Sequence, residues 1–225
     1  MTLDGPAGSG KSTTAREVAR RLGFRHLDSG ALYRALTFAL LDAGVPESEW
    51  PTLRAEDLRA LDVELRAVGG GFEVSVGGRP VSAELRTRAV TDRVATLARL
   101  AAARACLLEL QRRAGEEGRL VADGRDMGTV VFPDADVKVY LVADLEERAR
   151  RRLRELGVPD PTPERVAVEV DAIHARDSKD AGRDLSPLRK AEGSVEIDTT
   201  RLTFEEQVAR IVELVRQESR HGAPS

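Results

Sequence analysis

The sequence contains no asparagine, and several other residue types are scarce. Cys106 is its one cysteine, so no disulfide bond can form within the chain. Its histidines, at positions 26, 174 and 221, do not have the spacing of metal ligands. Lysine occurs only at positions 11, 138, 179 and 190, and arginine supplies most of the positive charge. Scarcity of Asn, Cys and Met is compatible with selection for heat resistance, and a GC-rich genome would produce the same bias.

Long apolar runs and a strong net charge are also missing. No run approaches the roughly 18 apolar residues that a membrane helix needs, and we expect neither a membrane contact nor a signal peptide. The net charge of −3 gives no general electrostatic reason for nucleic-acid binding. A hydrophobic content of 41% in 225 residues predicts a soluble, cytoplasmic protein with one good core and room for a small second lobe.

The chain opens on a phosphate-loop pattern, G-x-x-x-x-G-K-[ST], that runs from Gly5 to Ser12. Its glycines let several backbone N–H groups point at phosphate oxygens. Lys11 can reach the β- and γ-phosphates, and the Ser12 hydroxyl can ligate Mg²⁺. The pattern needs a strand before it and a helix after it, and the residues on both sides fit. A glycine-rich turn without a ligand is the alternative interpretation.

Strands and helices then alternate, which predicts an α/β fold with a parallel sheet covered on both faces. We expect strands at 1–4, 25–27, 119–123, 137–143 and 194–198, and ligands at their carboxyl ends. Residues 62–82 interrupt this order with a predicted antiparallel β-meander, typical of an inserted lobe. Ser29 is expected to be the N-cap of a helix through about 43. We expect disorder from about Ser219.

Four further segments are dense in polar groups. They are Asp28–Arg34, Asp123–Thr129, Arg148–Arg154 and Arg176–Arg183. Asp123 closes an apolar strand, where an acid can organise Mg²⁺ opposite a phosphate loop. The arginine run at 148–154 precedes a proline-rich loop and suggests a mobile flap. Arg176, Asp180 and Arg183 would share one face if the helix continued through them. Taken one at a time, these segments could also be a helix cap, a turn, a solvated helix face and a set of surface ion pairs.

Together with the phosphate loop, the arginines indicate phosphoryl transfer to an acceptor that is itself a phosphate. Arginine forks offset the repulsion between two phosphorylated substrates. An anionic acceptor needs no general base, so catalysis reduces to in-line positioning and charge neutralisation. The sequence shows neither a Ser-His-Asp set nor a metal-binding cluster.

Four stretches, in this order along nearly the whole chain, resemble bacterial cytidylate (CMP) kinases of the nucleoside monophosphate kinase branch. They are Asp4–Thr13, Leu27–Arg34, Ala122–Ala135 and Arg176-Asp177-x-x-Asp180-x-x-Arg183. The resemblance implies a P-loop three-layer fold with a five-stranded parallel sheet, a monophosphate-binding insert lobe and a lid. It also implies transfer of the γ-phosphoryl group of ATP to CMP or dCMP with Mg²⁺, in a monomer of pyrimidine metabolism.

The resemblance also implies roles for particular residues. ATP-binding residues would be Gly5, Pro6, Ala7, Gly8, Ser9, Gly10, Lys11, Ser12 and Thr13. The metal would be held by Ser12, with Asp123 acting through water. CMP-binding residues would be Ser29, Asp126, Arg104 and Arg183 at the base, Arg34 and Arg125 at the acceptor phosphate, and Asp180 at the sugar. Catalytic residues would be Lys11, Arg125, Arg148, Arg152 and Arg176.

The same resemblance divides one kinase domain, 1–225, into a core at roughly 1–30, 115–145 and 185–225, a monophosphate-binding lobe at 30–114 and a lid at 148–165. Relatives commonly have a base-contacting serine where Ala95 aligns, so discrimination among pyrimidines is expected to be weaker. Other hypotheses are a kinase for UMP or dephospho-coenzyme A, a GTPase and an ATP-driven nucleic-acid-binding protein. An N-K-x-D guanine motif is impossible without asparagine.

Overall fold

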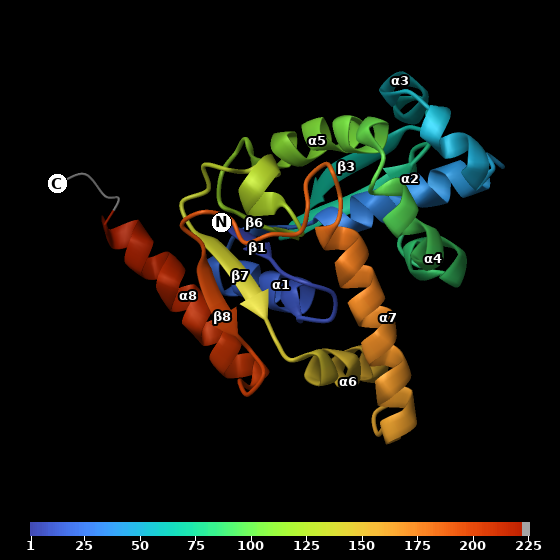
Figure 1. Ribbon diagram of the computed structural model, residues 1–225. Coiled ribbons are helices and arrows are strands. Elements are labelled where there is room, and N and C mark those ends of the chain that lie inside the picture. The colour runs from blue at the N-terminus through green and yellow to red at the C-terminus, as the bar shows by residue number, and fades with distance from the viewer. Residues whose placement is uncertain (222–225) are drawn as a thin grey trace. The chain divides into compact units, whose positions relative to one another are not determined.

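The computed structural model describes residues 1–221, which form two compact units (Figure 1). Unit 1 comprises Met1–Gly23 and Val121 onward, and unit 2 comprises Phe24–Leu120. Both mix helices with strands, and the parallel pairing in unit 1 confirms the predicted α/β class. Within residues 1–221 we find no helix with the length and apolar character needed to cross a bilayer.

Unit 1 is built on four parallel strands in the order β6-β1-β7-β8. They are β1 (Thr2–Asp4), β6 (Leu120–Gly124), β7 (Lys138–Val142) and β8 (Val195–Asp198). The register places Leu3, Val121 and Leu141 on one face of the sheet and Ala122 on the other, and all four are fully buried, so both faces are covered, as parallel sheets require. The helices are α1 (Lys11–Leu22), α6 (Leu145–Glu155), α7 (Pro163–Ala181) and α8 (Phe204–His221), with one π-helical turn, η3 (Met127–Val131).

Two helix pairs complete unit 1. Helix α1 packs on α8, and α6 packs along α7 (Figure 1). A small apolar cluster of Ala149, Leu153, Val166 and Ile173 fastens α6 to α7 and includes Ala7 of the phosphate loop. The phosphate loop is therefore in apolar contact with both helices.

Unit 2 combines an antiparallel meander with helices. The strands β3 (Val63–Val68), β4 (Gly71–Val76) and β5 (Arg79–Pro80) pair in sequence order, which confirms the predicted meander, and β2 (Arg25–Asp28) pairs with β4 in parallel. The helices are α2 (Ser29–Asp42), α3 (Ala55–Arg59), α4 (Arg88–Leu97) and α5 (Ala101–Gly115), with 3₁₀ turns η1 (Glu47–Thr52) and η2 (Glu84–Arg86). Helix α2 packs against α4, α5 and the meander.

Three local predictions are wrong. The N-cap of α2 is Asp28, because its carboxylate accepts the Ala31 N–H at 3.1 Å, and Ser29 is the first helical residue. Helix α7 ends at Ala181, so Arg183 lies beyond it and does not continue its face. Helix α8 continues to His221, so disorder does not begin at Ser219; the remainder of that predicted segment, and of the predicted core at 185–225, lies outside the described residues.

Candidate functional site

The phosphate loop joins β1 to α1 and carries the backbone that its sequence predicts. Gly8 and Gly10 have φ angles of +72° and +81°, which favour glycine, and Gly10 is the N-cap of α1. Lys11 Nζ donates to the Pro6 carbonyl at 3.1 Å, so the ammonium group lies back along the loop. Ser9 is fully buried, and its Oγ has no hydrogen-bond partner among the described residues. The loop thus holds one unsatisfied hydroxyl at the place where an anion would bind.

Ser12 and Asp123 meet at the start of α1. The Ser12 hydroxyl donates to Asp123 Oδ2 at 2.5 Å, and Asp123 is 1% exposed at the end of β6. A hydroxyl and one carboxylate are a donor set that suits Mg²⁺, which keeps several waters and completes its shell with substrate phosphates. No group of three or more His, Cys, Asp or Glu residues that could hold a metal occurs within residues 1–221, so this part of the chain offers no metal cage built from its own side chains alone. These residues fit a metal that arrives with a nucleotide.

Asp4 fixes the turn that follows β6. Its carboxylate accepts the backbone N–H groups of Met127 at 2.9 Å and Gly128 at 2.7 Å. Burial raises the pKa of Asp4 to about 6, although both backbone hydrogen bonds oppose the shift. Asp126 precedes the turn and is 3% exposed. One buried carboxylate in β1 therefore orients the segment that carries Asp126.

Arg125 and Asp180 form the centre of a second polar cluster in unit 1. Arg125 donates from Nε to Asp180 Oδ2 at 2.9 Å and from Nη1 to the Gly5 carbonyl at 3.0 Å. Arg183 also donates to Asp180, which is 2% exposed. Burial opposes ionisation of Asp180, but the two arginines outweigh it, so its pKa lies below the usual value. The carboxylate is thus ionised at neutral pH and holds both guanidinium groups.

The arginines of α6 and α7 face different partners. Arg148 is buried and donates to the Ala7 carbonyl at 2.9 Å and to Asp177 at 2.5 Å. Arg152 pairs with Glu169 of α7 at 2.6 Å. Arg176 lies on α7, one turn before Asp180, and its charge helps to lower the pKa of Asp180. Of the predicted catalytic arginines in α6, Arg148 is the one hydrogen-bonded to the phosphate loop.

The remaining predicted residues lie in unit 2. Ser29 Oγ is buried and accepts a hydrogen bond from Gln111 Nε2 at 2.7 Å. Arg104 Nη1 donates to the Ala98 carbonyl at 3.1 Å, and its guanidinium carbon lies 5.6 Å from the centroid of the Tyr33 ring. Arg34 lies one turn into α2, and a Cβ at Gly30 would be 3.0 Å from its Nη1, so glycine leaves room for the guanidinium. The structure thus groups the predicted residues into two sets, one in each unit.

Comparison with known proteins decides the family. The family model described as "Cytidylate kinase" matches residues 1–217. The chain belongs to the cytidylate kinase family. It is therefore a phosphotransferase, in agreement with the sequence-based resemblance.

Individual relatives agree with the family model. The chain is 42% identical over 214 residues to a cytidylate kinase of Exiguobacterium sibiricum and covers 95% of both chains. It is 40% identical over 220 residues to a cytidylate kinase of Bacillus subtilis, with 98% of this chain and 97% of that protein covered. It is also 44% identical to a bifunctional pantoate ligase/cytidylate kinase of Synechocystis, of whose length it spans 42%.

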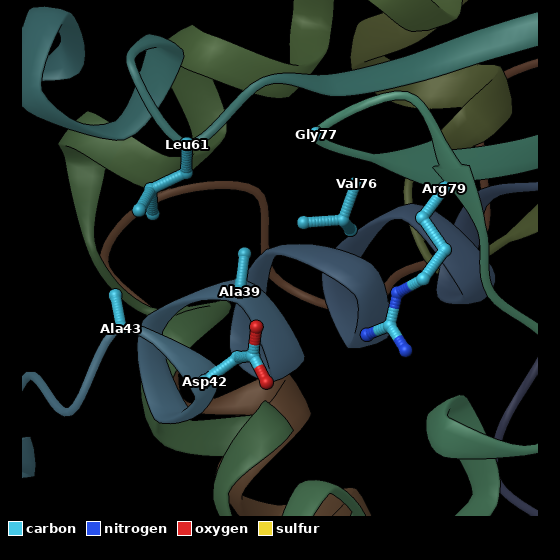
Figure 2. Close-up of a pocket in the computed structure, with 7 residues that line it drawn as sticks. All are labelled: Ala39, Asp42, Ala43, Leu61, Val76, Gly77 and Arg79. Carbon is cyan, nitrogen blue, oxygen red and sulfur yellow. The ribbon is translucent and has the colours of Figure 1, made fainter.

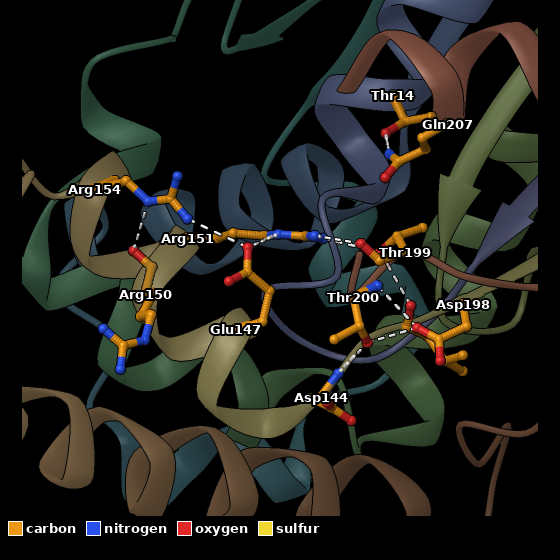
Figure 3. Close-up of polar contacts among 11 residues, drawn as sticks. Thr14, Asp144, Glu147, Arg150, Arg151, Arg154, Asp198, Thr199, Thr200 and Gln207 are labelled. Carbon is orange, nitrogen blue, oxygen red and sulfur yellow. Dashed lines mark hydrogen bonds and ion pairs between the residues drawn. The ribbon is translucent and has the colours of Figure 1, made fainter. Parts of the chain in front are cut away.

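A cavity of about 370 Å³ lies beside the phosphate loop, and some of its lining residues were not candidates from the sequence. Gly10 and Thr13 line it together with Glu147, Arg151 and Arg154 of α6 and with Phe204 and Gln207 of α8. Arg151 is held by Glu147 at 2.8 Å and by the Thr199 carbonyl at 2.6 Å, so its guanidinium spans from α6 to the end of β8 (Figure 3). The sequence singled out the loop and the arginine run, but no motif marks Glu147, Phe204 or Gln207, because the lining comes from three separate segments.

Gln207 ties this cavity to the loop. Its side-chain amide donates to Thr14 Oγ1 (Figure 3). The Thr14 hydroxyl in turn donates to the Gly10 carbonyl at 2.8 Å. A cavity of about 430 Å³ in unit 2 is lined by Ala39, Asp42, Ala43, Leu61, Val76, Gly77 and Arg79, none of which is a predicted site residue (Figure 2). The cavity beside the phosphate loop is therefore the better candidate for a nucleotide.

Proposed function

We propose that this protein transfers the γ-phosphoryl group of ATP to CMP and dCMP, forming CDP and dCDP. The observation that carries the proposal is the phosphate loop with Ser12 bonded to Asp123, in a chain that belongs to the cytidylate kinase family over residues 1–217. The cavity that adjoins Gly10 and Thr13 supports a nucleotide whose base lies beside the loop. We further propose a cytoplasmic monomer whose partners are these small molecules.

Mg²⁺ would be held by Ser12, with Asp123 acting through a water molecule. The ion would neutralise charge on the β- and γ-phosphates. The loop residues Gly5, Pro6, Ala7, Gly8, Ser9, Gly10, Lys11, Ser12 and Thr13 would surround the ATP phosphates. Lys11 supplies a mobile positive charge, and the loop N–H groups supply fixed donors.

For the acceptor, we propose that Asp126, Arg183, Ser29 and Arg104 contact cytosine. Cytosine presents an exocyclic amine donor, which suits the carboxylate of Asp126, and acceptor atoms, which suit arginine. Uracil carries a carbonyl where cytosine has the amine, so the carboxylate oxygens of Asp126 would meet another acceptor and repel it. Asp180 would bind the sugar hydroxyls, and Arg125 and Arg34 would hold the acceptor phosphate. Because Ala95 lies where a serine is expected, we propose weaker discrimination against UMP.

Arg148, Arg152 and Arg176 would approach the transferring phosphoryl group. The contact of Arg148 with the phosphate loop supports its role, whereas Arg152 is paired with Glu169 and would need to exchange that partner. We propose residues 30–114, which fall within unit 2, as the monophosphate-binding lobe and residues 148–165 as the lid, whose closure would exclude water.

The test is a phosphotransfer assay with purified protein, ATP, Mg²⁺ and each nucleoside monophosphate. We expect CDP from CMP and dCDP from dCMP. Turnover of UMP or AMP without any CDP from CMP would contradict the proposal. Asp126→Ala should raise the KM for CMP at least tenfold and the KM for ATP by less than twofold.

A further inference from the structure

One peptide unit of the phosphate loop is enclosed by an ion pair from the neighbouring helices. The Ala7 N–H donates to Asp177 Oδ1 at 3.0 Å, and the Ala7 carbonyl accepts from Arg148 Nη1 at 2.9 Å. Arg148 Nη1 also lies 2.5 Å from Asp177 Oδ2, which closes the ring of contacts. Asp177 thus contacts both the loop and the arginine that reaches it.

The packing around this ring leaves it little freedom. Ala7 is 2% exposed and packs with Ala149, Leu153 and Ile173 of α6 and α7. A Cβ at Gly8 would lie 2.9 Å from the Arg148 carbonyl oxygen, so the loop backbone meets the backbone of α6 directly. Arg148 Nε is buried and has no hydrogen-bond partner among the described residues, so this N–H donor of the guanidinium is unused.

The charge of Asp177 conflicts with the chemistry of a phosphate loop. Such a loop directs its backbone N–H groups at the oxygens of a nucleotide phosphate. Here the Ala7 N–H is bonded to a carboxylate, which is itself an anion and repels an incoming triphosphate. The same carboxylate holds Arg148 through a charge-assisted hydrogen bond.

We propose that Asp177 has two opposed effects on the reaction: it competes with the nucleotide phosphates for the Ala7 N–H, and it positions the guanidinium of Arg148 for phosphoryl transfer. This inference rests on the proposed function. Asp177 acts through Arg148 and is a positioning residue, so removing its charge strengthens ATP binding and slows transfer. If Asp177 only stabilised the fold, removing its charge would instead weaken ATP binding and slow transfer together.

The experiment measures MgATP affinity by titration calorimetry without CMP, and kcat with saturating ATP and CMP, for wild type and Asp177→Asn. We expect the Kd for ATP to fall about three- to tenfold, because a negative charge close to the triphosphate is removed. We expect kcat to fall about ten- to a hundredfold, because Arg148 loses its partner. In an Arg148→Ala background, Asp177→Asn should change kcat by less than twofold, because the two residues act as one unit.

Glu146→Ala is the matched control, since it removes one carboxylate from an exposed ion pair on α6 and should change neither value. If Asp177→Asn binds ATP with unchanged or weaker affinity, Asp177 does not compete with the nucleotide for the Ala7 N–H. If the kcat losses of the two single variants multiply in the double variant, Asp177 does not position Arg148. If Asp177→Asn does not fold, Asp177→Glu replaces it, since this variant keeps the negative charge but displaces the carboxylate. A wild-type Kd for ATP with a lowered kcat then supports the proposal, and a wild-type kcat overturns the proposal. Failure of the proposed function would differ from these outcomes, because wild type would then form no CDP whatever its ATP affinity.

Discussion

The ion pair of Arg125 and Asp180 allows a stability prediction. Their side chains are 16% and 2% exposed, with Nε and Oδ2 2.9 Å apart. Breaking a buried pair by removing one partner typically costs about 3–5 kcal/mol. Arg183 stays bonded to Asp180 and offsets part of that loss, so we expect Arg125→Ala to cost about 2–3 kcal/mol. For a chain of this length, that lowers Tm by about 5–10 °C.

The measurement is a thermal melt at neutral pH without nucleotide, since a bound ligand would mask the change. Glu146→Ala is again the control, because its pair with Arg150 has side-chain exposures of 64% and 45% and such pairs contribute at most about 1 kcal/mol. With about 3 °C of Tm per kcal/mol, the reasoning is refuted if the Tm of Arg125→Ala lies within about 2 °C of wild type. It is also refuted if the Tm of the control variant falls as far as that of Arg125→Ala.

The remaining predictions concern Asp4, Gly8 and Asp123. Burial raises the pKa of Asp4 from 3.8 to about 6, so between these pH values the folded chain binds more protons than the unfolded chain. The free energy of unfolding therefore falls by about 3 kcal/mol as the pH rises through that window. Asp4→Asn should flatten the curve of unfolding free energy against pH, and an unchanged slope would count against the buried carboxylate. Gly8→Ala should cost at least about 2 kcal/mol in urea denaturation, because the residue has a φ of +72° and its Cβ would clash with the Arg148 carbonyl; wild-type stability would show that the loop relaxes freely. Asp123→Ala should raise the Mg²⁺ concentration for half-maximal activity by about tenfold while the KM for CMP changes little, and an unaltered Mg²⁺ requirement would remove Asp123 from the metal site.

Local patterns were enough to predict much of the fold. The spacing of apolar residues in 12–22 identifies α1, and the alternation in 72–76 identifies β4, because side-chain period follows directly from backbone geometry. One error occurred where two adjacent residues could each cap the same helix. Asp28 and Ser29 are both good capping residues, and only the course of the backbone shows that Asp28 accepts the Ala31 N–H.

For the candidate site, the sequence names residues but not their contacts. The motifs predict Lys11, Ser12 and Asp123 as nucleotide-site residues, because a phosphate loop and its metal favour those residue types at those places. They do not show that Asp177, 170 residues after Ala7, bonds to the loop, because that pairing depends on how α6 and α7 pack. The cavity beside Gly10 was missed for the same reason, since residues from distant segments line it.

Asp4 links the phosphate loop mechanically to the turn beside Asp126. This carboxylate lies one residue before the phosphate loop, yet it anchors the turn next to Asp126 through two backbone hydrogen bonds. A shift of β1 by a fraction of an ångström would therefore move the donor-binding loop and the proposed base-reading carboxylate together. Changes in β1 should consequently alter ATP and CMP recognition in parallel, so either specificity could be retuned alone only through residues outside that strand.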